Sequence, residues 1–213
     1  QSPVSVPKGT TIIEAAKMAG VLVPHYCYHP KLPVAGNCRM CLVEIERKPH
    51  PLTACNTLLA DGMVISTHTP ALENERRMLL QMLAQDRPAD GLQQTPQKPF
   101  YRYARAYGLS ESDFTGSSEP HLLDDSHPYI HVDMSQCIVC YRCVRICDEV
   151  QGQFVWQIVN RGHETRIVPD SGTTLRESSC VSCGACVDTC PSGALEDKSL
   201  LAYGMPASWT RTT

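Results

Sequence analysis

The sequence has few aromatic residues, little net charge and no long apolar run. Aromatic side chains make up 6% of its 213 residues, and the formal net charge is only −3. A charge this small gives no reason to expect binding to nucleic acid or to an anionic membrane surface. No apolar stretch reaches the roughly 18 residues that a membrane-spanning helix requires. We therefore expect no nucleic-acid partner and no membrane partner.

The sequence also lacks the common catalytic motifs. It contains no G-x-G-x-x-G, no Walker phosphate loop and no G-x-S-x-G elbow, so nucleotide binding and acyl transfer have no local support. The first residues from Gln1 show neither an initiator methionine nor the apolar region of a signal peptide. We expect a cytoplasmic protein with reduced thiols, further residues before Gln1, and no catalytic residue within this chain.

Cysteine is the residue that the sequence has in abundance. Its twelve cysteines fall into three groups of four. The groups are Cys27, Cys38, Cys41 and Cys55; Cys137, Cys140, Cys143 and Cys147; and Cys180, Cys183, Cys186 and Cys190. The second and third groups both read C-x2-C-x2-C-x3-C, which is the 4Fe-4S motif of bacterial ferredoxins. This repetition, about 43 residues apart, predicts an internal duplication.

In two-cluster ferredoxins the fourth cysteine of each motif binds the other cluster. The sequence therefore predicts two crossed ligand sets. The first 4Fe-4S cluster is assigned to Cys137, Cys140, Cys143 and Cys190, and the second to Cys147, Cys180, Cys183 and Cys186. Cys190 is followed by Pro191, as in the ferredoxin motif, whereas Cys147 is followed by Asp148. That departure removes no ligand.

The N-terminal group reads C-x10-C-x2-C-x13-C, a relative of the plant-type 2Fe-2S pattern with a longer first gap. It predicts a 2Fe-2S cluster bound by Cys27, Cys38, Cys41 and Cys55. Gly36 lies in the first gap, where a tight turn would direct backbone N–H groups toward sulfur. Three arginines next to ligands would offset part of the cluster charge, and two histidines flank the first ligand. These residues are Arg39, Arg142, Arg145, His25 and His29.

Two other uses of cysteine fit less well. Structural disulfides are typical of secreted proteins, and the paired spacing is wrong for a disulfide scaffold. Zinc would leave the third closely spaced cysteine of each long run without a place in a tetrahedral site. The eight histidines show no metal-binding spacing of their own, so we expect them at the surface or as caps. Iron-sulfur ligation accounts for all twelve cysteines.

Residue periodicity predicts an α+β fold. We expect strands at residues 2–6, 39–46, 63–67 and 129–132, and a hairpin of residues 154–160 and 165–168. Helices are expected at residues 11–19, 71–85, 99–108, 142–150 and 184–189, the first opened by a Thr11–Glu14 capping box. Tyrosines and arginines alternate along residues 101–107, and we expect them to pack on protein rather than on nucleic acid.

The order of these elements predicts a β-grasp 2Fe-2S ferredoxin-like domain at residues 1–70 and a partly helical, irregular spacer at 71–128. A bacterial-type two-cluster 4Fe-4S ferredoxin-like domain follows at 129–198, and a linker toward a missing catalytic domain at 199–213. The clusters would replace part of the aromatic core that the composition lacks, since metal-binding free energy is also folding free energy.

Several motifs resemble one family of redox subunits. The segments Gly36-Asn-Cys-Arg-Met-Cys-Leu-Val-Glu44 and Thr53-Ala-Cys55 resemble the N-terminal region of the large iron-sulfur subunit of respiratory complex I. The same region occurs in NAD-linked hydrogenase diaphorase subunits, iron-only hydrogenases and NAD-dependent formate dehydrogenases. Many of these relatives carry a His and three Cys for a further 4Fe-4S cluster, but no cysteine lies between Cys55 and Cys137. We expect that cluster to be absent, which argues against complex I itself.

The second cysteine-rich segment and the final Trp209-Thr-Arg-Thr-Thr213 resemble the catalytic (alpha) subunit of NAD-dependent formate dehydrogenase. The resemblance implies the N-terminal electron-transfer portion of that oxidoreductase. Formate would be oxidised at a molybdenum or tungsten bis-pterin outside this chain, in the remainder of the catalytic subunit. Electrons would pass to a flavin- and NAD-binding iron-sulfur subunit. The alternatives are an electron-transfer subunit of an NAD-linked hydrogenase or NADH dehydrogenase, and a free ferredoxin.

Overall fold

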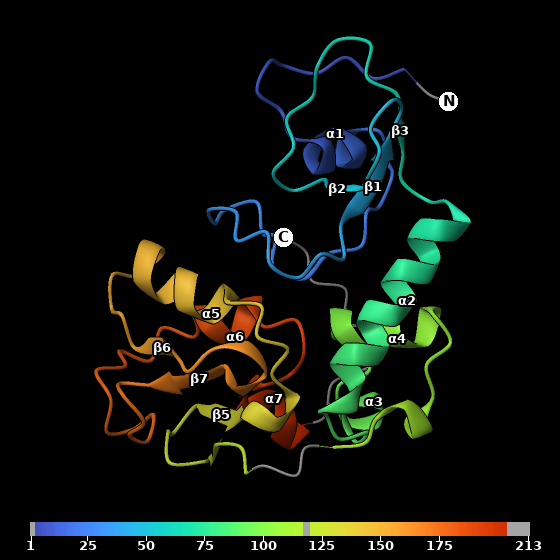
Figure 1. Cartoon of the computed structure of the whole chain (residues 1–213). Helices are drawn as coiled ribbons and strands as arrows, with labels where there is room; N and C mark the ends of the chain where they lie inside the picture. The colour runs from blue at the N-terminus through green and yellow to red at the C-terminus, as the bar shows by residue number, and fades with distance from the viewer. Residues whose placement is uncertain (1–2, 117–119, 204–213) are drawn as a thin grey trace. The chain divides into compact units, whose positions relative to one another are not determined.

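A computed structural model describes residues 3–116 and 120–203 and divides the chain into two compact units, residues 1–82 and 83–213 (Figure 1). Helix α2 (Pro70–Gln85) contains the boundary between them and confirms the helix expected at residues 71–85. In the part of the chain that the structure describes, no helix has both the length and the hydropathy of a membrane span.

The first unit is built on a small antiparallel sheet. Strand β1 (Leu42–Ile45) lies between β2 (Leu52–Thr53) and β3 (Ile65–Ser66). Helix α1 (Ile12–Met18) packs beside this sheet (Figure 1). The shared core consists of Ile12, Ile13, Val23, Tyr28, Cys41, Val43, Ile45, Ala54 and Cys55. Two of the predicted ligands are therefore part of the hydrophobic core of this unit.

Three expectations for the first unit need correction. Residues 3–6 form no strand, since Pro3 and Pro7 lack the backbone N–H that a sheet ladder requires. Strands β1 and β3 are shorter than the expected ranges 39–46 and 63–67. Helix α1 is confirmed, but the Thr11 side chain makes no capping hydrogen bond. Glu14 instead accepts a hydrogen bond from the Tyr28 hydroxyl.

The second unit contains two antiparallel sheets. Strand β5 (Ile130–Asp133) pairs with β4 (Leu123–Asp124) and with β8 (Leu195–Asp197), while β6 (Trp156–Val159) and β7 (Arg166–Pro169) form a hairpin. The strand expected at 129–132 and the hairpin are thereby confirmed. Strands β4 and β8 were not predicted, because two or three residues are too few to show an alternating pattern.

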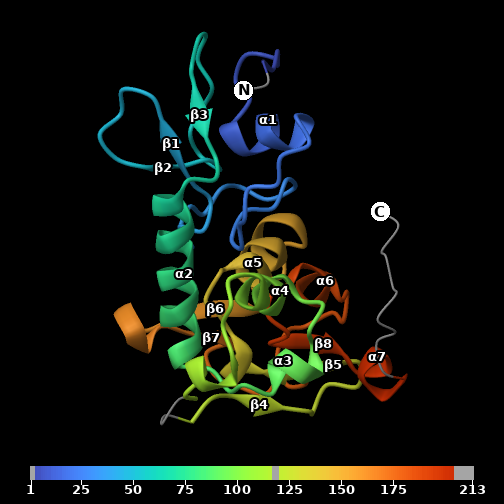
Figure 2. The same cartoon turned by 90° about the vertical axis from the view of Figure 1, so that its right-hand side faces the viewer.

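Short helices carry the two cysteine runs. The first run continues into α5 (Arg142–Arg145) and a π-helical turn η3 (Ile146–Val150), and the second into α6 (Ala185–Thr189). Figure 2 shows α6 beside β8, and these two elements are in contact. The remaining helices are α3 (Gly91–Gln94), α4 (Pro99–Ala106), η1 (Glu111–Asp113), η2 (Met134–Gln136), η4 (Gly162–Glu164) and α7 (Lys198–Tyr203).

Helix α4 confirms the helical segment expected around residues 99–108, and Phe100 and Tyr101 pack inward, whereas Arg102 and Arg105 are exposed. Phe100 and Tyr101 are fully buried, and both rings lie 6.1 Å from the ring of Phe114. The Tyr101 hydroxyl donates a hydrogen bond to the Gln136 side chain, just before the first cysteine run. This helix therefore supports the loop that begins at Cys137.

Candidate metal centres

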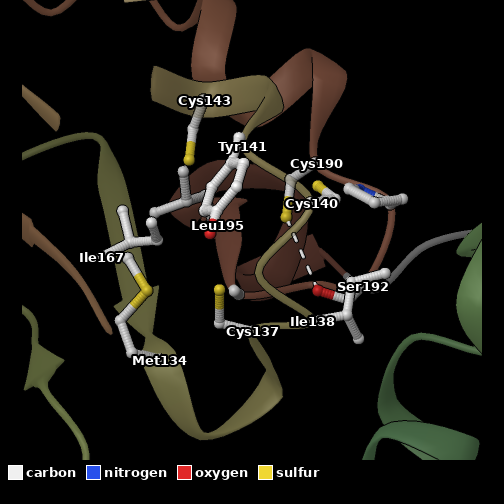
Figure 3. A pocket seen from close by; sticks show the side chains of 12 residues that line it. Met134, Cys137, Ile138, Cys140, Tyr141, Cys143, Ile167, Cys190, Ser192 and Leu195 are labelled. Atoms are coloured by element: carbon white, nitrogen blue, oxygen red, sulfur yellow. Dashed lines mark hydrogen bonds between the residues drawn. The ribbon is translucent and has the colours of Figure 1, made fainter. Parts of the chain in front are cut away.

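One cavity of the second unit brings together three cysteines of the first run and one of the second. Its lining includes Cys137, Cys140, Cys143 and Cys190, together with Tyr141, Ile167 and Leu195. Figure 3 shows the four thiols around this space, with Cys190 within 3.9 Å of the Ser192 hydroxyl. These are the four residues that the crossed-ligation rule assigns to the first 4Fe-4S cluster.

A second cavity has the reciprocal composition. It is lined by Cys147 from the first run and by Cys180, Cys183 and Cys186 from the second, with Trp156, Ile130 and Val155 beside them. Cys147 and Cys186 are buried, whereas Cys183 is exposed. Each predicted ligand set thus surrounds its own hydrophobic pocket.

The exchange of the fourth cysteine follows from how the helices pack. Helices α5 and α6 contact each other, so each can present a thiol to the loop from which the other begins. Cys190 ends α6 with an extended backbone (φ −66°, ψ 119°), the conformation favoured before Pro191. Cys147 instead lies inside the η3 turn, where the helix continues through Asp148. A proline at position 148 would interrupt that turn, which explains why the two motifs end differently.

The two cysteine loops repeat the same backbone conformation. The second residue after the first cysteine has a positive φ in both loops, 52° at Val139 and 58° at Ser182. Its N–H donates to the preceding thiol sulfur at 3.4 Å in each case, to Cys137 and to Cys180. Left-handed residues are rare outside glycine, so their recurrence at matching positions is evidence for the predicted duplication. Backbone N–H groups directed at sulfur stabilise thiolates.

The four N-terminal cysteines also lie close together. The Cys27 N–H donates to the Cys38 sulfur at 3.4 Å, and the thiols of Cys41 and Cys55 hydrogen-bond each other. Gly36 has φ +64°, the left-handed turn expected in the first gap. The exposed fraction is 1% or less at three of these residues, Cys27, Cys41 and Cys55. The site is therefore a buried cluster of thiols held by the loop that precedes β1 and by the turn that follows β2.

The thiols are held in an environment that disfavours free thiolates. Burial raises the pKa of Cys137 to about 11, and those of Cys140 and Cys186 to about 12. In the first unit the side-chain hydrogen bond with the Cys27 thiol, together with burial, raises the pKa of Cys38. Buried thiolates this close together repel one another unless a cation lies among them. Iron would supply that positive charge, so the chemistry of these donors fits an iron-sulfur cluster.

Among residues 3–116 and 120–203, no group of three or more His, Cys, Asp or Glu side chains closes on a single metal ion. The fit to a cluster therefore rests on the cysteine spacing and on the gathering of each set around a shared space.

The predicted auxiliary residues occupy different positions. Arg39 is exposed, whereas Arg142 donates to the Thr189 carbonyl at 3.3 Å, beside Cys190. His25 bonds the Val23 carbonyl at 2.7 Å, and the Nδ1 of His29 accepts from the backbone. Hence both histidines contribute to the shape of the loop around Cys27.

Sequence reasoning missed two buried arginines. Arg76 donates to the carbonyls of Met40, Leu42 and Thr67 at 3.2, 2.8 and 2.8 Å, and Met40 lies between two predicted ligands. Arg87 donates to the carbonyl of Cys137. The spacing of Arg76 four residues from the buried Leu72 and Leu80 was a signal for its position on α2, whereas Arg87 follows the end of α2 and carried no such signal.

His127 is only 3% exposed, so of the two positions expected for the histidines it takes the capping one and not the surface one. Its Nδ1 accepts from two backbone N–H groups, and its Nε2 lies 2.9 Å from the hydroxyl of Ser182. Because Ser182 lies between Cys180 and Cys183, this histidine supports the second cysteine loop.

Comparison with known families matches both cysteine-rich regions. Residues 1–70 match the 2Fe-2S iron-sulfur cluster binding domain, and residues 127–196 match the ferredoxin-like domain of NADH-quinone oxidoreductase subunit 3.

Individual relatives are redox proteins. The chain is 36% identical over 200 residues to the mitochondrial NADH dehydrogenase (ubiquinone) iron-sulfur protein 1 of Solanum tuberosum, covering 92% of this chain and 26% of that protein. It is 35% identical over 198 residues to NADP-reducing hydrogenase subunit HndD of Solidesulfovibrio fructosivorans, covering 90% and 34%. A crystal structure of an NAD+-reducing NiFe-hydrogenase in the H2-reduced state matches with a TM-score of 0.77 at 29% identity, over 92% of this chain and 84% of that one.

The chain thus spans about a quarter to a third of the length of these two curated relatives. By these comparisons it combines a 2Fe-2S cluster-binding domain with a ferredoxin-like domain of the NADH-quinone oxidoreductase type.

Proposed function

We propose that this chain conducts electrons through one 2Fe-2S and two 4Fe-4S clusters as part of an NAD-linked oxidoreductase. The proposal rests above all on one observation, that the cysteines of the second unit gather around two cavities in the crossed sets of a two-cluster ferredoxin. When bound, each cluster would accept and release one electron at a time. The chain's own residues would hold the clusters in place, exclude water and set their reduction potentials.

The relatives give the best indication of which compound donates electrons to this chain. Their names are those of NADH dehydrogenase and hydrogenase proteins, so we favour an electron-transfer role in a hydrogenase-type or NADH-dehydrogenase-type complex. The narrower expectation of formate dehydrogenase has less support. It depends partly on Trp209-Thr-Arg-Thr-Thr213, which lies outside the residues that the structure describes. Formate oxidation at a molybdenum or tungsten bis-pterin outside this chain is therefore our second candidate.

Both candidates need partners outside this chain. A flavin- and NAD-binding iron-sulfur subunit would exchange electrons with these clusters, and a separate catalytic domain would oxidise H2 or formate. The cytoplasm is the compartment we propose, because reducing conditions preserve the thiols for cluster assembly.

Anaerobic EPR of the native complex distinguishes the donors. H2, NADH and formate are added separately, and the reduced 2Fe-2S and 4Fe-4S signals are recorded. Reduction by H2 and NADH with no response to formate supports the hydrogenase type, and reduction by NADH alone supports the dehydrogenase type. Reduction by formate would shift the assignment to formate dehydrogenase. Absence of any iron-sulfur signal in iron-replete complex would refute electron transfer through this chain.

A further inference from the structure

A buried arginine lies beside the first 4Fe-4S site. Arg87 is 7% exposed, and its guanidinium donates to the carbonyls of Leu83 and Cys137. Burial lowers the pKa of Arg87, and the neighbouring Cys137 and Asp86 oppose that change. Since the ordinary pKa of arginine exceeds 12, the group stays cationic at neutral pH. The loop that begins at Cys137 therefore contacts a permanent positive charge.

Two more arginines add to this charge. Arg166, whose side chain bonds the His163 and Thr165 carbonyls, acts on the Cys137 thiol electrostatically in the same direction as Arg87. Arg142 does the same to Cys140. Arg87 and Arg142 also hydrogen-bond the backbone at this site, at the Cys137 carbonyl and at the Thr189 carbonyl directly before Cys190.

The charged side chain beside the second 4Fe-4S site is negative, in contrast to the arginines at the first. Asp170 accepts from the Ser179 N–H at 2.5 Å, directly before Cys180, and its charge acts on the Cys180 thiol. The opposing influences are neutral hydrogen bonds, from the Ser182 N–H to the Cys180 sulfur and from the Trp156 indole to the Cys186 sulfur. An indole N–H carries only a partial charge, whereas hydrogen bonds from charged groups are about twice as strong.

Reduction adds one negative charge to a cluster that already carries four thiolates. A fixed positive charge in a site of low dielectric constant stabilises the reduced form, and a carboxylate destabilises it. Arginine serves this purpose over a wide pH range because it does not deprotonate. The two clusters of one duplicated fold would therefore differ in potential through their neighbours rather than through their ligands.

We propose that the first 4Fe-4S cluster, assigned to Cys137, Cys140, Cys143 and Cys190, has the higher reduction potential of the pair, and that Arg87 is its main determinant. This inference rests on the proposed function. Electron transfer from the second cluster to the first is then downhill, and a single electron entering this domain resides on the first cluster. Arg87 is a positioning and tuning residue rather than a catalytic one.

The test is an EPR-monitored potentiometric titration of the native complex, comparing wild type with Arg87→Gln. The substitution keeps a donor near Cys137 but removes the charge. We expect the higher midpoint to fall so that the electron distribution between the two clusters changes about tenfold, which is 59 mV for a one-electron couple. The lower midpoint should stay unchanged.

Two further variants make the result specific. Arg105→Gln is the matched control, since Arg105 lies in the same unit, is exposed and donates to the Leu92 carbonyl. It should leave both midpoints in place. Trp156→Phe removes the bond to Cys186 and should lower only the lower midpoint, which identifies that signal as the second cluster.

Each outcome decides the proposal. If Arg87→Gln shifts the same signal as Trp156→Phe, or shifts neither signal, the proposed order of potentials is wrong. If Arg87→Gln fails to retain its cluster, Arg166→Gln provides the test, and an unchanged higher midpoint in that variant overturns the electrostatic argument. Arg87→Lys should keep the wild-type midpoint. Absence of 4Fe-4S signals from the wild type refutes the proposed function, whereas two signals with the wrong response refute only this inference.

Discussion

Removing the Arg76 side chain should strongly destabilise the first unit. Arg76 is 0% exposed, and three backbone carbonyls accept its hydrogen bonds, with the Glu73 carboxylate at 2.7 Å as a fourth partner. The Arg76→Ala variant leaves those carbonyls without this donor. Each buried polar group left unpaired costs about 1–3 kcal/mol.

The loss of unfolding free energy in Arg76→Ala depends on how many carbonyls lose their hydrogen-bond donor. The Leu42 carbonyl belongs to strand β1, where Leu42 pairs with Thr53. The carbonyls of Met40 and Thr67 lie outside the strands. We therefore expect a loss of about 3–5 kcal/mol, the usual cost of breaking a buried charged network. Since the free energy of unfolding of small domains is only about 5–15 kcal/mol, the first unit would lose much of its stability.

Urea unfolding of the iron-loaded protein measures this loss, and visible absorbance follows the 2Fe-2S cluster at the same time. The Met40 carbonyl lies between Cys38 and Cys41, so iron release should also accelerate. Arg77→Ala is the matched control, since Arg77 is the next residue of α2 and is exposed, and it should change stability by less than about 0.5 kcal/mol. Equal stability of the two variants would refute the role assigned to Arg76.

Three other changes test separate parts of the structure. Cys147→Ser should remove up to about four iron atoms per chain from the cluster of the second cysteine run, and iron analysis with EPR showing loss only of the neighbouring cluster would contradict crossed ligation. Burial opposes ionisation of Asp124, but hydrogen bonds from Ser126 and Leu175 outweigh it and lower its pKa. Its contribution to stability is thus present above about pH 4 and lost as the pH falls further; Asp124→Asn should reduce hydrogen-exchange protection of the Leu175 amide at pH 7, and equal protection in both proteins would refute this. Gly91→Ala would place a Cβ 2.1 Å from the Tyr101 ring, so a cost of about 1–3 kcal/mol in urea unfolding is expected, whereas helix propensity alone predicts stabilisation.

The proposed order of reduction potentials would give electron transfer between the two clusters a preferred direction. Clusters in one duplicated domain have the same kind of ligands, and an electron would distribute evenly between them if their surroundings were equal. Arg87 and Asp170 make those surroundings unequal. Tuning by neighbouring charge leaves the cysteine motifs intact, so it can differ among relatives that share the same spacing.

The sequence by itself determined the features that depend on local spacing. Cysteines separated by two residues must share a loop, and the repeated motif predicted a duplicated domain with two crossed ligand sets. The apolar stripe of residues 71–85 likewise predicted helix α2, because a stripe of that length has no other regular fold. The iron content and the crossed assignment stay predictions until the clusters are measured.

Tertiary structure decided the features that depend on which distant segments meet. Periodicity places Arg76 on the same helix face as Leu72 and Leu80, but only the packing within the first unit directs its guanidinium to the carbonyl of Met40. Similarly, Arg87 reaches Cys137 across 50 residues of sequence. A hydrogen bond between remote segments depends on the complete packing of the chain, so the charge around each cluster site becomes visible only in the folded protein.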